Sequence, residues 1–155
     1  MELHQPYENL VYYGRGPFEN YIDRYSSSFI GRYEDKVENQ FYWYIRPQET
    51  GNKTDVRWLS LLDSEGQGVR ITGLPPISFS ALHFSPEDLD PGLTRKLQHT
   101  IDIVPQKNIF LHVDLKQRGL GGDNSWGMYP HNEYRLLDKK YTYSYMIELV
   151  EKNSD

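Results

Sequence analysis

Four acidic side chains lie in surroundings where carboxylates could act together: Glu19, Asp23, Asp114 and Asp123. Hydrolysis of a glycosidic bond uses two carboxyl groups that flank the bond, about 5 to 9.5 Å apart. The chain contains 22 acidic residues, so some pair would look suggestive by chance. Acids in turns also commonly accept hydrogen bonds from backbone N–H groups. The residues alone therefore favour structural roles over a catalytic pair within this chain.

The residue types and their spacing give little support to other kinds of catalysis or to metal binding. His83, His99 and His112 fall in expected strands without the i, i+2 pairing that metal-ligand sets often have. Cysteine is absent, so the chain has no thiolate metal site and no disulfide framework. A Gly-x-Ser-x-Gly nucleophile elbow is also missing. We expect no catalytic residue, no metal and no cofactor in this chain.

Phe110 is the residue that stands out for binding. Apolar residues alternate from Ile109 to Leu115, which predicts a half-buried strand, and Phe110 shares the opposite face with His112 and Asp114. An aromatic ring can pack against the apolar C–H patch of a pyranose. Two interpretations stay open: the ring contacts a sugar, or it packs beneath a neighbouring loop.

A glycine-punctuated loop follows this strand and ends at Trp126. It contains Gly121 and Gly122, followed directly by Asp123. Glycine tolerates positive φ and close backbone approach, so we expect the loop to follow a fixed, sharply turned path.

The elements that would position these residues are short strands, which predicts an all-β protein with an antiparallel β-sandwich. The alternation of apolar and polar residues ends at turn signals such as the Gly-Gln-Gly of residues 66–68. Ser85 followed by Pro86 predicts one short helix over 86–89. Residues 1–7 look frayed, and residues 25–31 and 34–39 look like connections. The expected strands are 10–13, 41–45, 56–62, 69–72, 77–84, 98–104, 109–115, 133–136 and 141–150, with a break at 73–76.

Bulk properties narrow the class of protein. A chain of 155 residues suits one domain and can bury roughly 70% of its unfolded surface. The net charge of −5 without a basic run argues against a nucleic-acid partner. No apolar run approaches the ~20 residues of a membrane span. The 13 tyrosines and 3 tryptophans suit strands and also sugar-binding surfaces.

Four motifs then carry a resemblance. In order, they are GRGPFENYIDR at 14–24, PQETGNKTDVRW at 47–58, FSALHFSPEDL at 79–89 and DLKQRGLGGDNSW at 114–126. Together they resemble the C-terminal domain of large bacterial β-galactosidases of glycoside hydrolase family two. The resemblance covers almost the whole chain.

The resemblance implies a fold and a parent protein. The fold would be part of a galactose-mutarotase-like supersandwich, and residues 1–155 would be a single domain, the C-terminal fragment of a larger enzyme. That enzyme would hydrolyse terminal β-galactosides with retention. Its two catalytic glutamates and a divalent metal, magnesium, would lie in a TIM barrel, which needs about 250 residues and so lies outside this chain. Its compartment would be the bacterial cytoplasm or periplasm.

The resemblance also assigns roles to residues. Phe110 would occupy the place of a family Trp that forms an aromatic platform at the active site. Arg24 and Arg57 would brace loops by donating to carboxylates. The expected partners are a β-galactoside, the remaining domains of the parent and, as one possible assembly, a homo-oligomer. The alternative is a free-standing carbohydrate-binding module. The expected loop supports are Asp114, Gly121, Gly122, Asp123 and Trp126.

Overall fold

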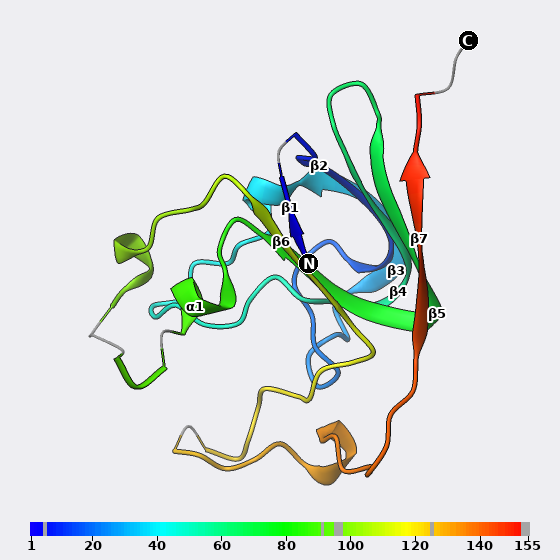
Figure 1. Ribbon diagram of the computed structural model, residues 1–155. Coiled ribbons are helices and arrows are strands. Elements are labelled where there is room, and N and C mark those ends of the chain that lie inside the picture. The colour runs from blue at the N-terminus through cyan, green and yellow to red at the C-terminus, as the bar shows by residue number, and fades with distance from the viewer. Residues whose placement is uncertain (5, 91, 95–97, 125, 153–155) are drawn as a thin grey trace.

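A single antiparallel sheet organises the computed structural model, which describes residues 1–4, 6–90, 92–94, 98–124 and 126–152 (Figure 1). Within these ranges the sheet has seven strands in the order β1-β6-β5-β4-β2-β3, and β7 also pairs with β5. The strands are β1 (Glu2–Leu3), β2 (Asn9–Gly16), β3 (Phe29–Lys36), β4 (Lys53–Leu62), β5 (Gly68–Leu82), β6 (Ile109–Asp114) and β7 (Ser144–Val150).

Strand β5 is the longest element and has different neighbours along its length. Its first part, Gly68 to Leu74, pairs with β7. Its last part, Ser78 to Leu82, pairs with β6. Strand β4 follows β5 on the other side, with register shifts near Val56. One edge of β5 is therefore shared by two strands, β7 along its first part and β6 along its last part, and these two strands run in different directions (Figure 1).

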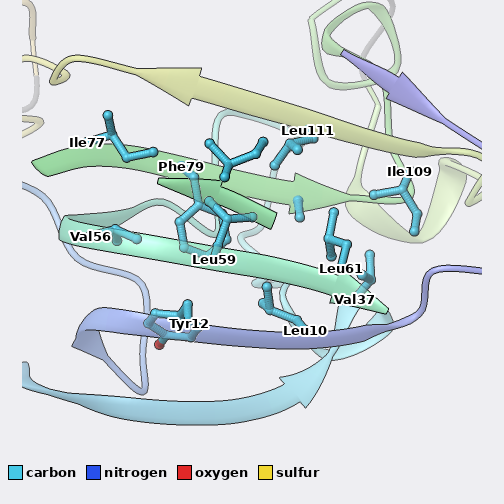
Figure 2. Close-up of a cluster of buried hydrophobic side chains, with 12 residues drawn as sticks. Leu10, Tyr12, Val37, Val56, Leu59, Leu61, Ile77, Phe79, Ile109 and Leu111 are labelled. Carbon is cyan, nitrogen blue, oxygen red and sulfur yellow. The ribbon is translucent and has the colours of Figure 1, made fainter. Parts of the chain in front are cut away.

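The main hydrophobic core lies on one face of this sheet. Side chains of β2, β4, β5 and β6 point toward one another in Figure 2, with Tyr12 and Phe79 in edge-to-face contact at 5.4 Å between ring centroids. Full burial of one such side chain contributes roughly 1.5–3 kcal/mol. The members are Leu10, Tyr12, Val37, Val56, Leu59, Leu61, Ile71, Ile77, Phe79, Ala81, Ile109 and Leu111.

The helices are short, and the α-helix follows the end of β5. In α1 (Pro86–Leu89) the N–H of Asp88 donates to Ser85 Oγ at 3.2 Å, and the N–H of Ser85 donates to the Asp88 carboxylate at 2.8 Å. The helix adds Leu89 to a second cluster, whose members are Phe41, Leu82, Phe84, Leu89 and Ile103. The 3₁₀ helices are η1 (Val37–Asn39), η2 (Gly92–Thr94), η3 (Thr100–Asp102) and η4 (Asn132–Tyr134).

Several sequence predictions are confirmed. The chain is all-β with an antiparallel sheet, which is consistent with a β-sandwich. Strand β6 begins at Ile109 as predicted, the helix over 86–89 forms behind its Ser85 cap, and β4 and β5 form a hairpin around Gly66. No helix in the described ranges has the length and apolar character needed to cross a membrane.

The strand predicted at residues 41–45 is wrong. Backbone groups there bond locally: the N–H of Tyr42 donates to Thr50 Oγ1 at 3.1 Å, and the N–H of Tyr44 donates to the Tyr42 carbonyl at 3.0 Å. The rings pack on each other, with Phe41 and Trp43 at 4.8 Å between centroids. The aromatic residues of this segment therefore pack on one another and do not form a strand.

The strands predicted at 98–104 and 133–136 are also wrong, because short turns replace them. Helix η3 begins where the N–H of His99 donates to the Asp102 carboxylate at 2.8 Å. Helix η4 places Tyr134 so that its carbonyl accepts from the N–H of Gly119 at 2.7 Å. Local side-chain and turn bonds compete with strand pairing at such sites.

The predicted ends and connections need further correction. Strand β5 runs through the break predicted at 73–76. The prolines there have no N–H to donate, but the pairing partner of β5 changes from β7 to β6 at this point. The prolines therefore do not interrupt a continuous ladder of hydrogen bonds. Strand β3, expected as connecting sequence, pairs with β2 along its whole length. It is an exposed edge strand without an apolar period. At the N-terminus β1 pairs with β6, and strand β7 begins at Ser144 and not at Tyr141.

Candidate functional site

Phe110 lies inside the sheet, between β1 and β5. Its register partners are Glu2 on β1 and Leu82 on β5. The neighbours Ile109 and Leu111 are fully buried in the core, whereas Phe110 is half-buried on the opposite face. The predicted alternation is therefore present. Because Leu82 belongs to the second cluster, the ring lies beside an apolar surface and also has a partly open side.

Polar groups gather on the same face of β6. His112 and Asp114 are half-buried there, and the side chain of Gln117 donates to Asp114 Oδ2 at 3.3 Å. The carboxyl of Glu49 lies close to them. Although Glu49 is exposed as a whole residue, withdrawal of its carboxyl from water raises its pKa, and Asp114 adds to this while His112 and Gln117 oppose it.

The glycine-rich loop is tied to the first motif. The N–H of Gly121 donates to Asp23 Oδ2 at 2.7 Å. A Cβ on Gly122 would lie 2.4 Å from the carbonyl oxygen of Met128, so only glycine fits there without a shift. The backbone of the loop therefore approaches another backbone segment closely at Gly122, whereas Gly121 is held through its N–H.

The remaining predicted loop residues lie further out. Asp123 Oδ1 and His131 Nε2 are 2.9 Å apart, and this exposed contact raises the pKa of His131. The N–H of Trp126 donates to Asn124 Oδ1 at 2.8 Å, but the Trp126 side chain is 91% exposed. Trp126 therefore presents its indole to the surroundings and does not pack within the described chain.

Glu19 forms the most connected site, which sequence reasoning treated only as one of several acids. One carboxylate oxygen accepts from the Arg24 guanidinium and the Tyr44 hydroxyl. The other accepts from Thr50 Oγ1 at 3.1 Å and from the N–H of Gly51 at 2.8 Å. Burial of the Glu19 carboxyl acts to raise its pKa, but these hydrogen bonds outweigh burial and the pKa is lowered. The prediction that Arg24 donates to a carboxylate is confirmed, whereas Arg57 donates to the carbonyl of Asp55.

Asn20 joins the first two motifs into one unit. Its Oδ1 accepts from the N–H of Thr54 at 3.0 Å and also from the Thr54 hydroxyl. Its Nδ2 donates to the carbonyl of Arg15 at 3.1 Å, and its backbone N–H donates to the carbonyl of Asn52 at 2.8 Å. Residues more than thirty positions apart therefore hold one another, and the only sequence signal for this was the motifs themselves.

A cleft of ≈500 Å³ opens beside the Glu19 unit. Aromatic side chains of Phe18, Tyr42 and Tyr44 line it, together with Lys53. Lys53 is only 2% exposed, and burial, which disfavours its charged form, lowers its pKa to about 8. Sequence reasoning did not single out Lys53.

The acidic side chains that the sequence singled out are engaged within this chain. The carboxylates of Glu19, Asp23 and Asp114 each accept hydrogen bonds from groups of this chain. Among the described residues, no group of three or more histidine or acidic side chains could hold a metal ion. Phe110 is a half-buried ring on the paired strand β6, and the loop after that strand is bound to Asp23.

Most of the chain matches a known family. The model of the family described as "Beta galactosidase small chain" matches residues 1–147. The chain belongs to the β-galactosidase small chain family. The suspected family is thus confirmed, and Asn20, Glu19 and Asp23 join three of its four ordered motifs in space, those at 14–24, 47–58 and 114–126.

Curated relatives of this β-galactosidase small chain domain are bacterial. A "Beta-galactosidase" of Priestia megaterium is 35% identical over 147 residues, covering 94% of this chain. A "Beta-galactosidase" of Streptococcus thermophilus is 35% identical over 144 residues, covering 92% of the chain. "Beta-galactosidase BgaC" of Bifidobacterium adolescentis is 36% identical over 133 residues, covering 84% of the chain. The aligned part spans only 14%, 14% and 12% of these three relatives, respectively.

Proposed function

We propose that this chain is the C-terminal domain of a β-galactosidase that hydrolyses terminal non-reducing β-D-galactosides, and that Phe110 supplies an aromatic wall to the active site. The observation that carries the proposal is the placement of Phe110. Pairing with β1 and β5 fixes its backbone, and its ring lies on the partly open face of the sheet. A ring held in this way can stack on a sugar without losing much conformational freedom.

In this proposal the polar neighbours of Phe110 complete the wall. His112 lies two residues further along the same face of β6, and the carboxyl of Glu49 is close to it. Sugar hydroxyls both donate and accept hydrogen bonds, so a carboxyl and an imidazole beside a ring suit them. Gln117 and Asp114 hold the end of the strand.

We further propose that the chain is not catalytic alone. A retaining glycosidase needs one carboxylate free to attack and a second carboxyl group free to protonate the leaving oxygen, about 5–5.5 Å apart. Glu19 accepts four hydrogen bonds, and Asp23 is engaged with the backbone of Gly121. Both catalytic groups and the magnesium ion of the parent then belong to other domains of the enzyme.

The exposed apolar residues of strand β7 support contact between this chain and those other domains. Its core-side residues Tyr145 and Ile147 continue the face on which Ile71 is buried, yet they are 40% and 51% exposed. Leu149, at 79%, extends the same strip. An exposed apolar strip of this kind suits contact with another protein surface. We propose that the rest of the parent covers it, either within one protomer or in a homo-oligomer.

Two measurements test the proposal. The purified chain should not hydrolyse a chromogenic β-galactoside, and turnover that depends on Asp114 or Asp123 would overturn the non-catalytic role. In the full-length enzyme, Phe110→Ala should raise KM about two- to thirteenfold, because one stacking contact is worth about 0.5–1.5 kcal/mol. Phe110→Trp should retain binding. Phe29→Ala, which removes an exposed ring from β3, is the control. An unchanged KM in Phe110→Ala would remove the aromatic wall from the proposal.

The alternative is a free-standing carbohydrate-binding module. The exposed rings of Tyr42, Trp43 and Trp126 favour it, since flat aromatic surfaces bind sugars. Calorimetry with galactose and lactose separates the two proposals. Millimolar or tighter binding by the chain alone, abolished by Phe110→Ala, would favour the module over the active-site wall.

A further inference from the structure

The cleft beside Glu19 contains a buried amine that the proposed galactosidase role does not use. Lys53 begins strand β4 and is 2% exposed, yet it is one of the residues that line this cleft of ≈500 Å³. We propose that the cleft is a covalent binding site for small aldehydes, in which Lys53 Nζ forms a Schiff base. This inference does not depend on the proposed contact between Phe110 and a sugar.

The hydrogen bonds of Lys53 suit an uncharged amine. Nζ donates to Gln40 Oε1 at 3.0 Å and to the carbonyl of Gly51 at 3.2 Å. A neutral amine has two N–H groups and one lone pair, so these two acceptors use both N–H groups and leave the lone pair for attack. An ammonium group would carry a third N–H, for which no acceptor is found among the described residues.

The nearby carboxylates do not pair directly with Lys53. Glu19 accepts from Arg24, Tyr44, Thr50 and Gly51. The carboxylate of Asp35 accepts from the side chains of Asn39 and Gln40, each at 2.8 Å, and from the N–H of Lys36 at 2.7 Å. No ion pair within the described residues includes Lys53. The two acids therefore act on the amine only at longer range.

The charge balance around Lys53 supports this geometry. Burial lowers the pKa of Lys53 from 10.5 to about 8, although the negative charges of Glu19 and Asp35 oppose the change. About a tenth of the amine is then uncharged at pH 7, against roughly one part in 3,000 for an ordinary lysine. Desolvation of a lysine in an apolar pocket is a recognised way to make it nucleophilic.

The walls of the cleft define the class of ligand. Phe18, Tyr42 and Tyr44 offer aromatic surface, and Ser27 and Asn39 offer hydroxyl and amide groups. A volume of ≈500 Å³ admits a small organic molecule. Short hydroxyaldehydes, including open-chain sugars, combine a reactive carbonyl with hydroxyl groups that match these polar side chains.

The step requires no oxidant or reductant. The lone pair of Nζ forms a bond to the carbonyl carbon while the C=O π pair moves to oxygen. A proton passes from nitrogen to that oxygen, which gives a carbinolamine. Loss of water then forms the C=N bond, so that amine and aldehyde give imine and water.

The experiment uses glycolaldehyde as the probe. The chain is incubated with glycolaldehyde and cyanoborohydride, which traps the imine as a secondary amine, and the modified lysines are located by peptide mass spectrometry. Lys53 should react about tenfold faster at pH 7.5 than Lys139 and Lys140, which are exposed. Its rate should level off near pH 8, whereas the rates of the exposed lysines should keep rising.

Two variants complete the test. Lys53→Arg keeps a cation but removes the nucleophile, so the fast adduct should disappear, whereas Lys36→Arg should leave it intact. Circular dichroism checks that both variants fold. If Lys53→Arg does not fold, the pH profile of Lys53 in the unmodified sequence still decides. A rate at Lys53 equal to or below that of Lys139, with the same pH profile, would overturn the proposal.

Discussion

The N–H of Gly121 donates a 2.7 Å hydrogen bond to the carboxylate of Asp23, although the two residues are 98 positions apart. This contact joins the loop that follows β6 to the first family motif. A Cβ on Gly119 would lie 2.6 Å from the same carboxylate, so the loop passes very close to Asp23. The path of the loop after the Phe110 strand therefore depends on a residue near the start of the chain.

Removing this contact should loosen the loop. In Asp23→Ala the N–H of Gly121 loses its acceptor, so the free energy of unfolding should fall by about 1–3 kcal/mol. Hydrogen–deuterium exchange of residues 119–122 should become faster. Asp123→Ala, in the same loop but with an exposed partner, should change stability by less than about 1 kcal/mol. Unchanged exchange in Asp23→Ala would show that the loop is held by other contacts.

Two adjacent glycines should tolerate substitution very differently. An added Cβ on Gly122 would lie 2.4 Å from the carbonyl oxygen of Met128, whereas one on Gly121 would lie 3.4 Å from Asp23 Oδ2. Gly122→Ala should therefore lower the free energy of unfolding by about 1–3 kcal/mol, and Gly121→Ala by less than about 1 kcal/mol. Chemical denaturation measures both. Equal effects would mean that the loop shifts easily to make room.

Acid should weaken the Glu19 unit. Because its hydrogen bonds lower the pKa of Glu19, its contribution to stability is fully present above the unfolded value of 4.5 and is lost as the pH falls through the lower folded pKa. Glu19→Gln should cost about 2 kcal/mol at pH 7 and flatten the acid side of the stability profile. Glu34→Gln, which affects an exposed pair with Arg32, is the control. If the stability of Glu19→Gln fell with acid as steeply as that of the unmodified chain, the acid dependence would not come from Glu19.

Lys53 should also make stability rise with pH, but in the alkaline range. Its folded pKa of about 8 lies below the unfolded value of 10.5, so the unfolded chain binds more protons between these values. Stability should therefore rise with pH from about 8 to 9.5, before unfolded tyrosines ionise. In Lys53→Met this rise should disappear, as measured by urea denaturation at a series of pH values. A rise of the same size in Lys53→Met would assign it to another group.

Substitutions of Ile71 and Ile147 should distinguish a residue of the core from a residue of an interface. Ile71 is 1% exposed and Ile147 is 51% exposed, although they lie opposite each other on neighbouring strands. In the chain alone, Ile71→Ala should cost about 2–5 kcal/mol and Ile147→Ala less than about 1 kcal/mol. In the longer protein of which we propose this chain is a part, Ile147→Ala should become clearly destabilising. A cost below about 1 kcal/mol there would mean that the rest of the parent does not cover β7.

Local sequence patterns determined much of this structure. The alternation around Phe110 predicted β6, because side chains of a strand point to opposite faces in turn. Ser85, Pro86 and Asp88 predicted the short helix, since its capping bonds join residues three positions apart. The glycines at 66 and 68 predicted the hairpin between β4 and β5. The motifs also indicated the family, which the comparison confirms.

Tertiary structure decided the rest, because it depends on contacts between distant residues. Strand β5 continues through its prolines only because β7 and β6 meet it on either side of them. The aromatic segment at 41–45 contributes Phe41 to the second cluster and forms no strand. Burial of Glu19 and Lys53 follows from the docking of two motifs, and no local pattern encodes burial of a charged side chain. Only the folded chain brings Gly121 to Asp23, and with it the loop that follows Phe110.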